Sequence, residues 1–283
     1  MNQVFHHIGL LVKSHQKDSE FVRACVLFLI KQGKKVQVLL HDTEDKMVAD
    51  FCFNDPAIDL IIIYGGDGTL LSYARNCNIS LPVLGINGGS LGWLSAIDPA
   101  KEWKKEMKKI IRGDYQLINK FILSVSVERN GKTVLKERAV NDAVVNNREL
   151  SRIISIEAHV DQEYLTEYRA DGLIVSTPTG STAYNLSAGG PILYPSLEGI
   201  IITPISPQSL SQRSVVIPGD KKVLLSFVKN KHLLRLTLDG QRVFDLEKDD
   251  EVTICLLAEK LQLIKTEDYS FFEMLGQKLG WGR

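Results

Sequence analysis

The 283-residue sequence has no excess of charge of either sign, because 34 Lys and Arg residues balance 34 Asp and Glu residues. Proteins that coat nucleic acid usually carry a basic excess, since phosphate contacts supply most of their affinity. The one basic stretch, residues 101–109, is interspersed with acidic and apolar residues, which predicts an amphipathic helix with a solvated face. We therefore expect no nucleic-acid partner.

Cysteine is scarce, and its four positions are widely spaced: Cys25, Cys52, Cys77 and Cys255. No CxxC pair and no Cys/His cluster with zinc-ligand spacing occurs. We therefore expect the cysteines to be reduced, as they are in cytoplasmic proteins. The first residues lack the pattern of a signal peptide, and the apolar run at 26–30 is too short to span a membrane. We expect a cytoplasmic protein without a membrane partner.

The first 118 residues alternate between strand-like and helix-like patterns. Apolar runs typical of buried strands lie at residues 8–12, 36–40, 60–63 and 82–86, and helical spacing lies at 18–32 and from 70 to 76. Strands separated by helices predict a parallel sheet with helices on its faces. We expect a Rossmann-like α/β domain over residues 1–118, and we assign residues from about 260 to 283 to it because 269–279 regains helical spacing. This C-terminal helix is expected to pack back on the first domain.

After residue 118 the pattern changes to short alternating segments. They lie at residues 123–127, 153–160, 173–176, 223–227 and 233–238, separated by turn signals such as Asn130-Gly131, Asp171-Gly172, Pro218-Gly219 and Asp239-Gly240. This pattern predicts an antiparallel, β-sandwich-like domain over residues 119–259. The whole chain is thus expected to combine an α/β domain with a β domain.

A glycine-rich turn at residues 65–69 follows a buried strand and leads into a helix. Its three glycines bring backbone N–H groups close to a ligand, and N–H groups at a helix N-terminus form an anion site. The turn matches neither GxxxxGK[ST] nor GxGxxG. We predict a phosphate loop formed by Gly65, Gly66 and Thr69.

Asp67 is the unusual residue of this loop, because a carboxylate should repel phosphate unless it has a chemical role. Phosphoryl transfer supplies one, since a carboxylate can accept the proton of the attacking hydroxyl group. The other interpretation is a helix cap, because Asp is common at helix starts. The loop by itself leaves both open.

A second polar segment, residues 169–191, is rich in hydroxyl groups, glycines and amides that can bind ribose and phosphate oxygens. Its Asp171-Gly172 pair is also a strong hairpin signal, and the hydroxyl-rich run could be an ordinary polar loop. A third element, Asn141-Asp142, is typical of a turn, with paired hydrogen bonds to sugar hydroxyls as its functional interpretation.

Together these elements resemble the NAD kinase family. The matching segments are GINGGSLGWL at 85–94, GGDGT at 65–69, NDAVV at 141–145, DGLIVSTPTGSTAYNLSAGGP at 171–191 and LDGQ at 238–241. Trp93 departs from the family, which usually has Phe there. The resemblance spans residues 60–245, and the first fifty residues match little beyond their strand pattern.

The resemblance implies that Asp67 accepts the proton of the 2′-hydroxyl group of the adenosine ribose. It implies that Asp171 lies near the nicotinamide end, and that the charged Arg169 goes with preference for NAD over NADH, although a surface ion pair is the alternative. The residues expected to bind NAD are Gly68, Asn141, Asp142, Arg152, Arg169, Asp171, Thr182, Ala183, Tyr184, Asn185, Leu186, Ser187, Ser206 and Gln241.

The resemblance further implies ATP as donor, a divalent metal ion with Mg²⁺ expected, and a homodimer or homotetramer. The sequence assigns no metal ligands. Two alternatives remain: a lipid or sphingoid kinase would share GGDGT but lack TPTGSTAY at 177–184, and a non-catalytic NAD(P)-binding sensor would not need Asp67. The presence of both features favours an NAD kinase.

Overall fold

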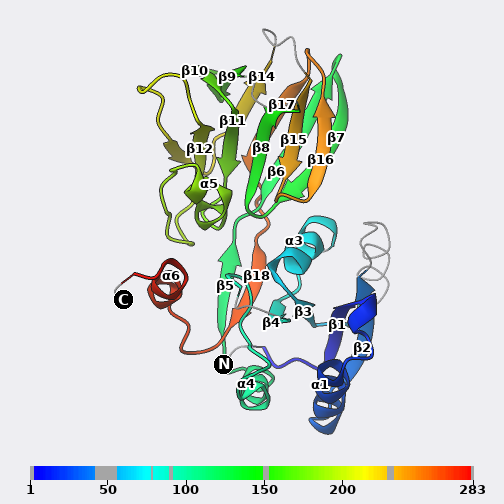
Figure 1. Ribbon diagram of the computed structural model, residues 1–283. Coiled ribbons are helices and arrows are strands. Elements are labelled where there is room, and N and C mark those ends of the chain that lie inside the picture. The colour runs from blue at the N-terminus through cyan, green and yellow to red at the C-terminus, as the bar shows by residue number, and fades with distance from the viewer. Residues whose placement is uncertain are drawn as a thin grey trace. The chain divides into compact units, whose positions relative to one another are not determined.

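The computed structural model describes residues 3–41, 56–77, 79–88, 92–148, 153–227 and 233–281 (Figure 1). The chain divides into two compact units, one of Met1–Asn119 with Leu261–Arg283 and the other of Lys120–Lys260. In the described part of the chain, no helix is long and apolar enough to cross a membrane.

The first unit contains a six-stranded sheet. Its strands, in spatial order, are β2 (Lys35–His41), β1 (His7–Lys13), β3 (Leu60–Gly65), β4 (Val83–Asn87), β18 (Leu261–Lys265) and β5 (Gln116–Lys120). The four strands predicted from apolar runs are confirmed, and β1 pairs in parallel with both β2 and β3. Since β2 and β3 lie on opposite sides of β1, the strand order reverses there, and ligands of such sheets bind beyond the carboxyl ends of the strands at that point.

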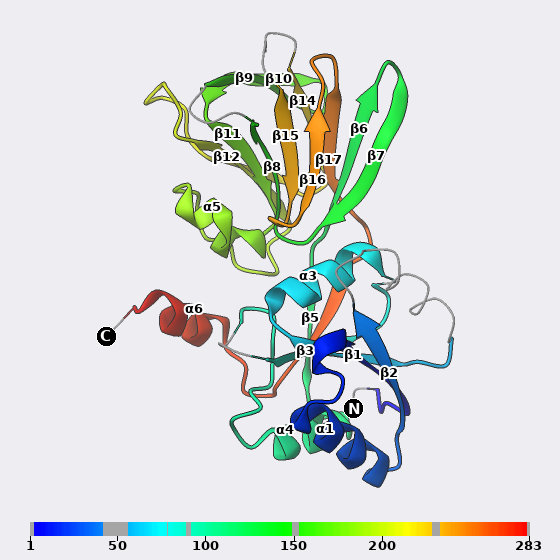
Figure 2. The same cartoon turned by 45° about the vertical axis from the view of Figure 1, so that its right-hand side comes forward.

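Helices cover both faces of this sheet, as Figures 1 and 2 show. They are α1 (Glu20–Lys31), α3 (Asp67–Asn76) and α4 (Trp103–Ile110), and α6 (Phe271–Leu279) follows β18. Leu84 and Ile86 of β4 share a core with α1 and α4, whereas Gly85 between them faces Leu70 of α3. The expected α/β architecture and the amphipathic helix at 101–109 are therefore confirmed.

The second unit consists of two antiparallel sheets. One has the order β10 (Glu163–Ala170), β9 (Ile154–Val160), β14 (Val223–Ser226), β17 (Glu251–Leu256), β6 (Leu123–Arg129), β7 (Lys132–Ala139). The other has the order β13 (Val215–Pro218), β12 (Gly199–Ile205), β11 (Gly172–Ser176), β8 (Asp142–Asn147), β15 (Leu234–Leu238), β16 (Arg242–Leu246). One apolar core contains alternate residues of both sheets, such as Val125 of β6 and Val175 of β11, which confirms the sandwich.

Of the four predicted turns, two are hairpins, whereas Asp171-Gly172 and Pro218-Gly219 connect strands of different sheets. Asn130-Gly131 joins β6 to β7 and Asp239-Gly240 joins β15 to β16, with positive φ at all four residues. Asp171 instead lies between β10 and β11, which belong to different sheets. The hairpin interpretation of Asp171-Gly172 is therefore wrong, because the chain crosses from one sheet to the other there.

Candidate active site

A cavity of about 490 Å³ lies beyond the carboxyl ends of β1, β3 and β4 in the first unit. It is lined by Lys13, His15, Gln16, Gly65, Gly66, Asp67, Asn87, Gly88, Gly92 and Lys278. The strand order reverses at β1, and sheets of this kind bind ligands beyond the carboxyl ends of the strands at such a point. A ligand site is therefore expected here. The cavity therefore combines the glycine loop with residues from three other parts of the first unit.

The glycine loop ends β3 at Gly65 and starts α3 at Asp67, with Gly66 as the N-cap residue. Backbone N–H groups of a first helical turn have no partner within the helix, and they attract anions. Gly65 and Gly66 line the cavity, but Thr69 is buried behind them. A Cβ atom on Gly65 would lie 2.7 Å from the Thr69 hydroxyl oxygen, so glycine is needed for this close approach.

Asp67 lines the cavity, and its carboxylate accepts hydrogen bonds from another loop. The Trp93 N–H donates to Oδ2 at 2.7 Å, and the Leu94 N–H donates to Oδ1 at 3.2 Å. Since Gly66 is the N-cap and the carboxylate bonds outside its own helix, the helix-cap interpretation is wrong. Each carboxylate oxygen has a further lone pair with which it can accept a proton or hydrogen bond.

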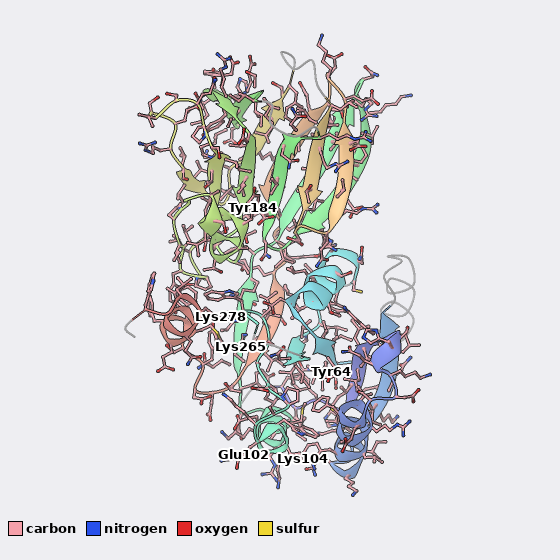
Figure 3. The ribbon with its side chains drawn as sticks, in the orientation of Figure 1. Tyr64, Glu102, Lys104, Tyr184, Lys265 and Lys278 are labelled. Atoms are coloured by element: carbon pink, nitrogen blue, oxygen red, sulfur yellow. The ribbon has the colours of Figure 1, made fainter. Side chains whose placement is uncertain are left out.

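Two lysines give the cavity its positive charge. Lys13 is the last residue of β1, and Lys278 extends from α6, where Figure 3 labels it. Neither ammonium group forms an ion pair with a described residue. An anion with several oxygens, such as a polyphosphate, fits this combination of lysines and helix N–H groups.

Protein ligands for a metal ion are few. Within the described ranges no group of three or more His, Cys, Asp or Glu residues could hold one. Mg²⁺ typically keeps waters and binds through one or two carboxylates together with substrate phosphates. The site therefore fits a cation that enters with a phosphate ligand and does not fit a cation held in a protein cage.

In the second unit, the start of β8 is fixed by a buried aspartate. The Asp239 carboxylate accepts hydrogen bonds from the N–H groups of Val140, Asn141 and Asp142 at 2.7–3.4 Å. The Asn141 carbonyl accepts from the Ser176 hydroxyl at 3.1 Å and the Thr177 N–H at 2.9 Å. The predicted Asn141-Asp142 pair is thus held by residues of β11 and the β15–β16 turn, and it is no simple turn.

The Asp142 side chain is only 4% exposed. Burial, and secondly the negative charge of Asp239, raise the pKa of Asp142 from its ordinary 3.8 to about 7. A buried carboxyl group with a raised pKa is a common feature of functional sites, because folding alone does not favour it.

The hydroxyl-rich segment forms η2 (Gly180–Thr182) and α5 (Tyr184–Ser187). A Cβ atom on Gly180 would overlap the Asn141 carbonyl oxygen, so glycine lets this segment lie directly on the start of β8. Tyr184 and Ser187 are exposed, with Tyr184 labelled in Figure 3, and Thr182, Ala183 and Leu186 are partly exposed. These side chains offer hydroxyl groups and an aromatic ring to a ligand.

Asn185 differs from its neighbours because it is fully buried. Its Nδ2 donates to the carbonyl oxygens of Ser181 and Pro191, both at 3.1 Å, and its Oδ1 accepts from the Thr203 hydroxyl at 2.7 Å. These bonds hold the shape of the segment. Asn185 therefore positions the exposed residues around it.

The remaining predicted residues lie in other places. Arg169 and Asp171 are exposed, and backbone bonds of 2.8 and 2.9 Å join them to Gln208 and Ile205, on either side of Ser206. Gln241 is exposed after the Asp239-Gly240 turn. Gly68 is exposed on α3, and Arg152 lies outside the described residues.

Sequence reasoning missed Lys13, Lys278 and Asp239 as site residues. Lys13 directly follows a predicted buried strand, so the rule that ligands bind at carboxyl ends could have identified it. Lys278 had no such signal, because it lies in a helix far along the chain. Asp239 was assigned to a turn and to the LDGQ segment but not to the site, yet its carboxylate fixes the start of β8.

Known proteins resemble this chain over nearly its whole length. Residues 9–115 match the family model of the ATP-NAD kinase N-terminal domain, and residues 140–266 match that of the C-terminal domain. The NAD kinase of Cellvibrio japonicus (strain Ueda107) is 41% identical over 291 residues, covering 98% of this chain and 97% of that protein. The NAD kinase of Pseudomonas fluorescens (strain SBW25) is 36% identical over 294 residues, covering 98% and 96%.

Solved structures agree with these matches. Yeast NADH kinase complexed with NADH has a TM-score of 0.81 at 25% identity, covering 99% of this chain and 89% of that chain. An NAD kinase from Archaeoglobus fulgidus in complex with ATP has a TM-score of 0.75 at 24% identity, covering 98% and 100%. The second similarity concerns the fold alone.

Proposed function

This chain belongs to the NAD kinase family, and we propose that it transfers the γ-phosphoryl group of ATP to the 2′-hydroxyl of the adenosine ribose of NAD, with Asp67 as general base. The observation that carries the proposed chemistry is the position of Asp67, a carboxylate in a cavity otherwise suited to phosphate. A non-catalytic sensor would need no proton acceptor at this position.

The reaction is a displacement at phosphorus. The 2′-oxygen forms a bond to the γ-phosphorus, the bond from that phosphorus to the β,γ-bridging oxygen breaks, and ADP leaves. Asp67 accepts the proton of the 2′-hydroxyl group. The N–H groups at the start of α3 and the ammonium groups of Lys13 and Lys278 bind the phosphate oxygens, since this chemistry depends on positioning and charge neutralisation. A divalent cation, with Mg²⁺ expected, neutralises further phosphate charge when bound.

NAD binding is assigned mainly to the second unit. We propose that Asn141 and Asp142 form hydrogen bonds with the dinucleotide, and that Thr182, Tyr184 and Ser187 supply contacts from the neighbouring segment. Their support is the network that fixes the start of β8 and the exposed hydroxyl groups beside it. We also propose a cytoplasmic location, on the basis of the scarce, widely spaced cysteines, and a homodimer or homotetramer, as the family resemblance implies.

The test is incubation of the purified protein with ATP, Mg²⁺ and either NAD or NADH, followed by assay with an NADP-specific dehydrogenase, with NADPH measured separately. We expect NADP to form, and faster than NADPH, because Arg169 is charged. Absence of product despite tight dinucleotide binding would favour the sensor. Equal rates with NAD and NADH would remove Arg169 from the specificity argument.

Lys13→Met and Lys278→Met test whether the cavity that contains Asp67 binds the phosphates of ATP. Charged hydrogen bonds contribute about 1.5–3 kcal/mol, so each variant is expected to raise the KM for ATP about tenfold or more. The KM for NAD should change much less in steady-state kinetics. Lys17→Met is the matched control, because Lys17 is exposed nearby but does not line the cavity. An equal KM for ATP in all three variants would contradict the assignment.

A further inference from the structure

Lys265 is a buried lysine at the end of β18, only 1% exposed. Its Nζ donates to the backbone carbonyl oxygens of Trp93 at 3.2 Å, Leu94 at 3.0 Å and Ser95 at 2.6 Å. An ammonium group has three N–H donors, and three carbonyls match them, which offsets the cost of burying the charge. Figure 3 labels Lys265, which belongs to the first unit, as does the cavity that contains Asp67.

The same short segment is bonded from its other side by Asp67. The Trp93 and Leu94 N–H groups donate to the Asp67 carboxylate. The peptide group between Trp93 and Leu94 therefore has its carbonyl on Lys265 and its N–H on Asp67. The negative end of this peptide dipole meets the Lys265 ammonium group and the positive end meets the Asp67 carboxylate. Hydrogen bonds linked in this way strengthen each other.

The segment has little freedom to move in other directions. The Ala96 N–H donates to the Gly85 carbonyl at 2.8 Å, and a Cβ atom on Gly85 would lie 2.9 Å from the Ser95 Cα. The backbone of the segment is thus packed directly on β4. Lys265 donates to the carbonyls of this segment, while Lys13, His15 and Lys278 line the same cavity as Asp67.

We propose that Lys265 is a positioning residue for phosphoryl transfer: it fixes residues 93–95, and through the Trp93–Leu94 peptide it sets the orientation of the Asp67 carboxylate. Lys265 does not line the cavity, so its proposed effect on Asp67 runs through this segment. The inference rests on the proposed role of Asp67 as base. If the segment no longer fixes the orientation of the Asp67 carboxylate, the carboxylate loses the alignment that it needs to accept a proton.

Lys265→Met is the first test variant. We expect kcat to fall about 10- to 100-fold, since misplacement of a reacting group by about 1 Å has effects of this size, with both KM values nearly unchanged. Hydrogen exchange of the Trp93 and Leu94 amides, followed by NMR, should become at least about tenfold faster. Lys265→Gln retains two N–H donors without the charge, and it should recover part of both effects.

The control is Lys120→Met, which removes another buried ammonium group, only 4% exposed. In the described part of the chain Lys120 forms no hydrogen bond to residues 93–95, so its loss should leave their amide exchange unchanged. Unchanged kcat or unchanged amide exchange in Lys265→Met would overturn the inference.

A double-mutant cycle separates this inference from the proposed function. If Lys265 acts through Asp67, adding Lys265→Met to Asp67→Asn should cost less than about twofold more in kcat. An equally large loss in both backgrounds would overturn the positioning role alone. Retention of kcat by Asp67→Asn would overturn the proposed base, and the inference with it.

Discussion

Asp67→Asn is expected to lower kcat by about 100- to 10,000-fold, which is the usual contribution of a general base. The asparagine amide cannot accept the proton of the attacking hydroxyl group. NAD affinity should stay within about threefold, because the proposed base acts in the transition state and most of the proposed NAD contacts belong to the second unit. Steady-state rates of NADP formation and calorimetric titration with NAD measure the two quantities.

The structure adds a second role for Asp67, and a matched variant separates the two. Asp67 also anchors the Trp93 and Leu94 amides, so its loss could act through the loop. Gly92→Ala retains the carboxylate but would place a Cβ atom on its oxygens, so the carboxylate must turn. We expect a smaller fall in kcat for Gly92→Ala than for Asp67→Asn. Near-normal kcat in Asp67→Asn would leave Asp67 as a loop anchor only.

The elements that sequence predicted well are those with a local signal. Apolar runs identified β1 to β4 because buried parallel strands are apolar on both faces. The start of α3 was placed at residue 70 although the helix begins at Asp67, since Gly68 and Thr69 form helices poorly. Strand β7 went unnoticed because half of its residues are charged and all except Ala139 are at least partly exposed.

The candidate site likewise contains features that have a local sequence signal and features that lack one. Glycine loops and hydroxyl-rich segments are local, so the sequence predicts them. The contacts of Lys265 with residues 93–95 depend on β18 pairing beside β4, and those of Asp239 depend on β15 pairing with β8. No local pattern predicts which distant strands become neighbours, so these supporting residues emerged only from the structure.

Because of Asp142, the free energy of unfolding is expected to fall as the pH rises, which is the opposite of the usual effect of an acidic residue. Its pKa is raised in the folded protein from 3.8 to about 7 by burial and by Asp239, so between these values the folded state holds a proton that the unfolded state releases. The stabilisation from this proton is fully present below the unfolded pKa and is lost as pH rises through about 7. Above that pH the folded protein contains a buried, ionised carboxylate beside a second acid.

Asp142→Asn is therefore expected to stabilise the protein more at pH 8 than at pH 5, because at pH 5 only the first part of the loss between 3.8 and about 7 has occurred. One pH unit corresponds to about 1.4 kcal/mol, so the gain at pH 8 should lie at about 1–4 kcal/mol in thermal unfolding. Asp239→Asn is the control: its carboxylate accepts backbone N–H groups from residues 140–142, so that variant should be destabilised at both pH values. An equal effect of Asp142→Asn at pH 5 and pH 8 would contradict the raised pKa. A gain at pH 8 together with weaker NAD binding would mean that the chain retains this acid for its ligand at the expense of stability.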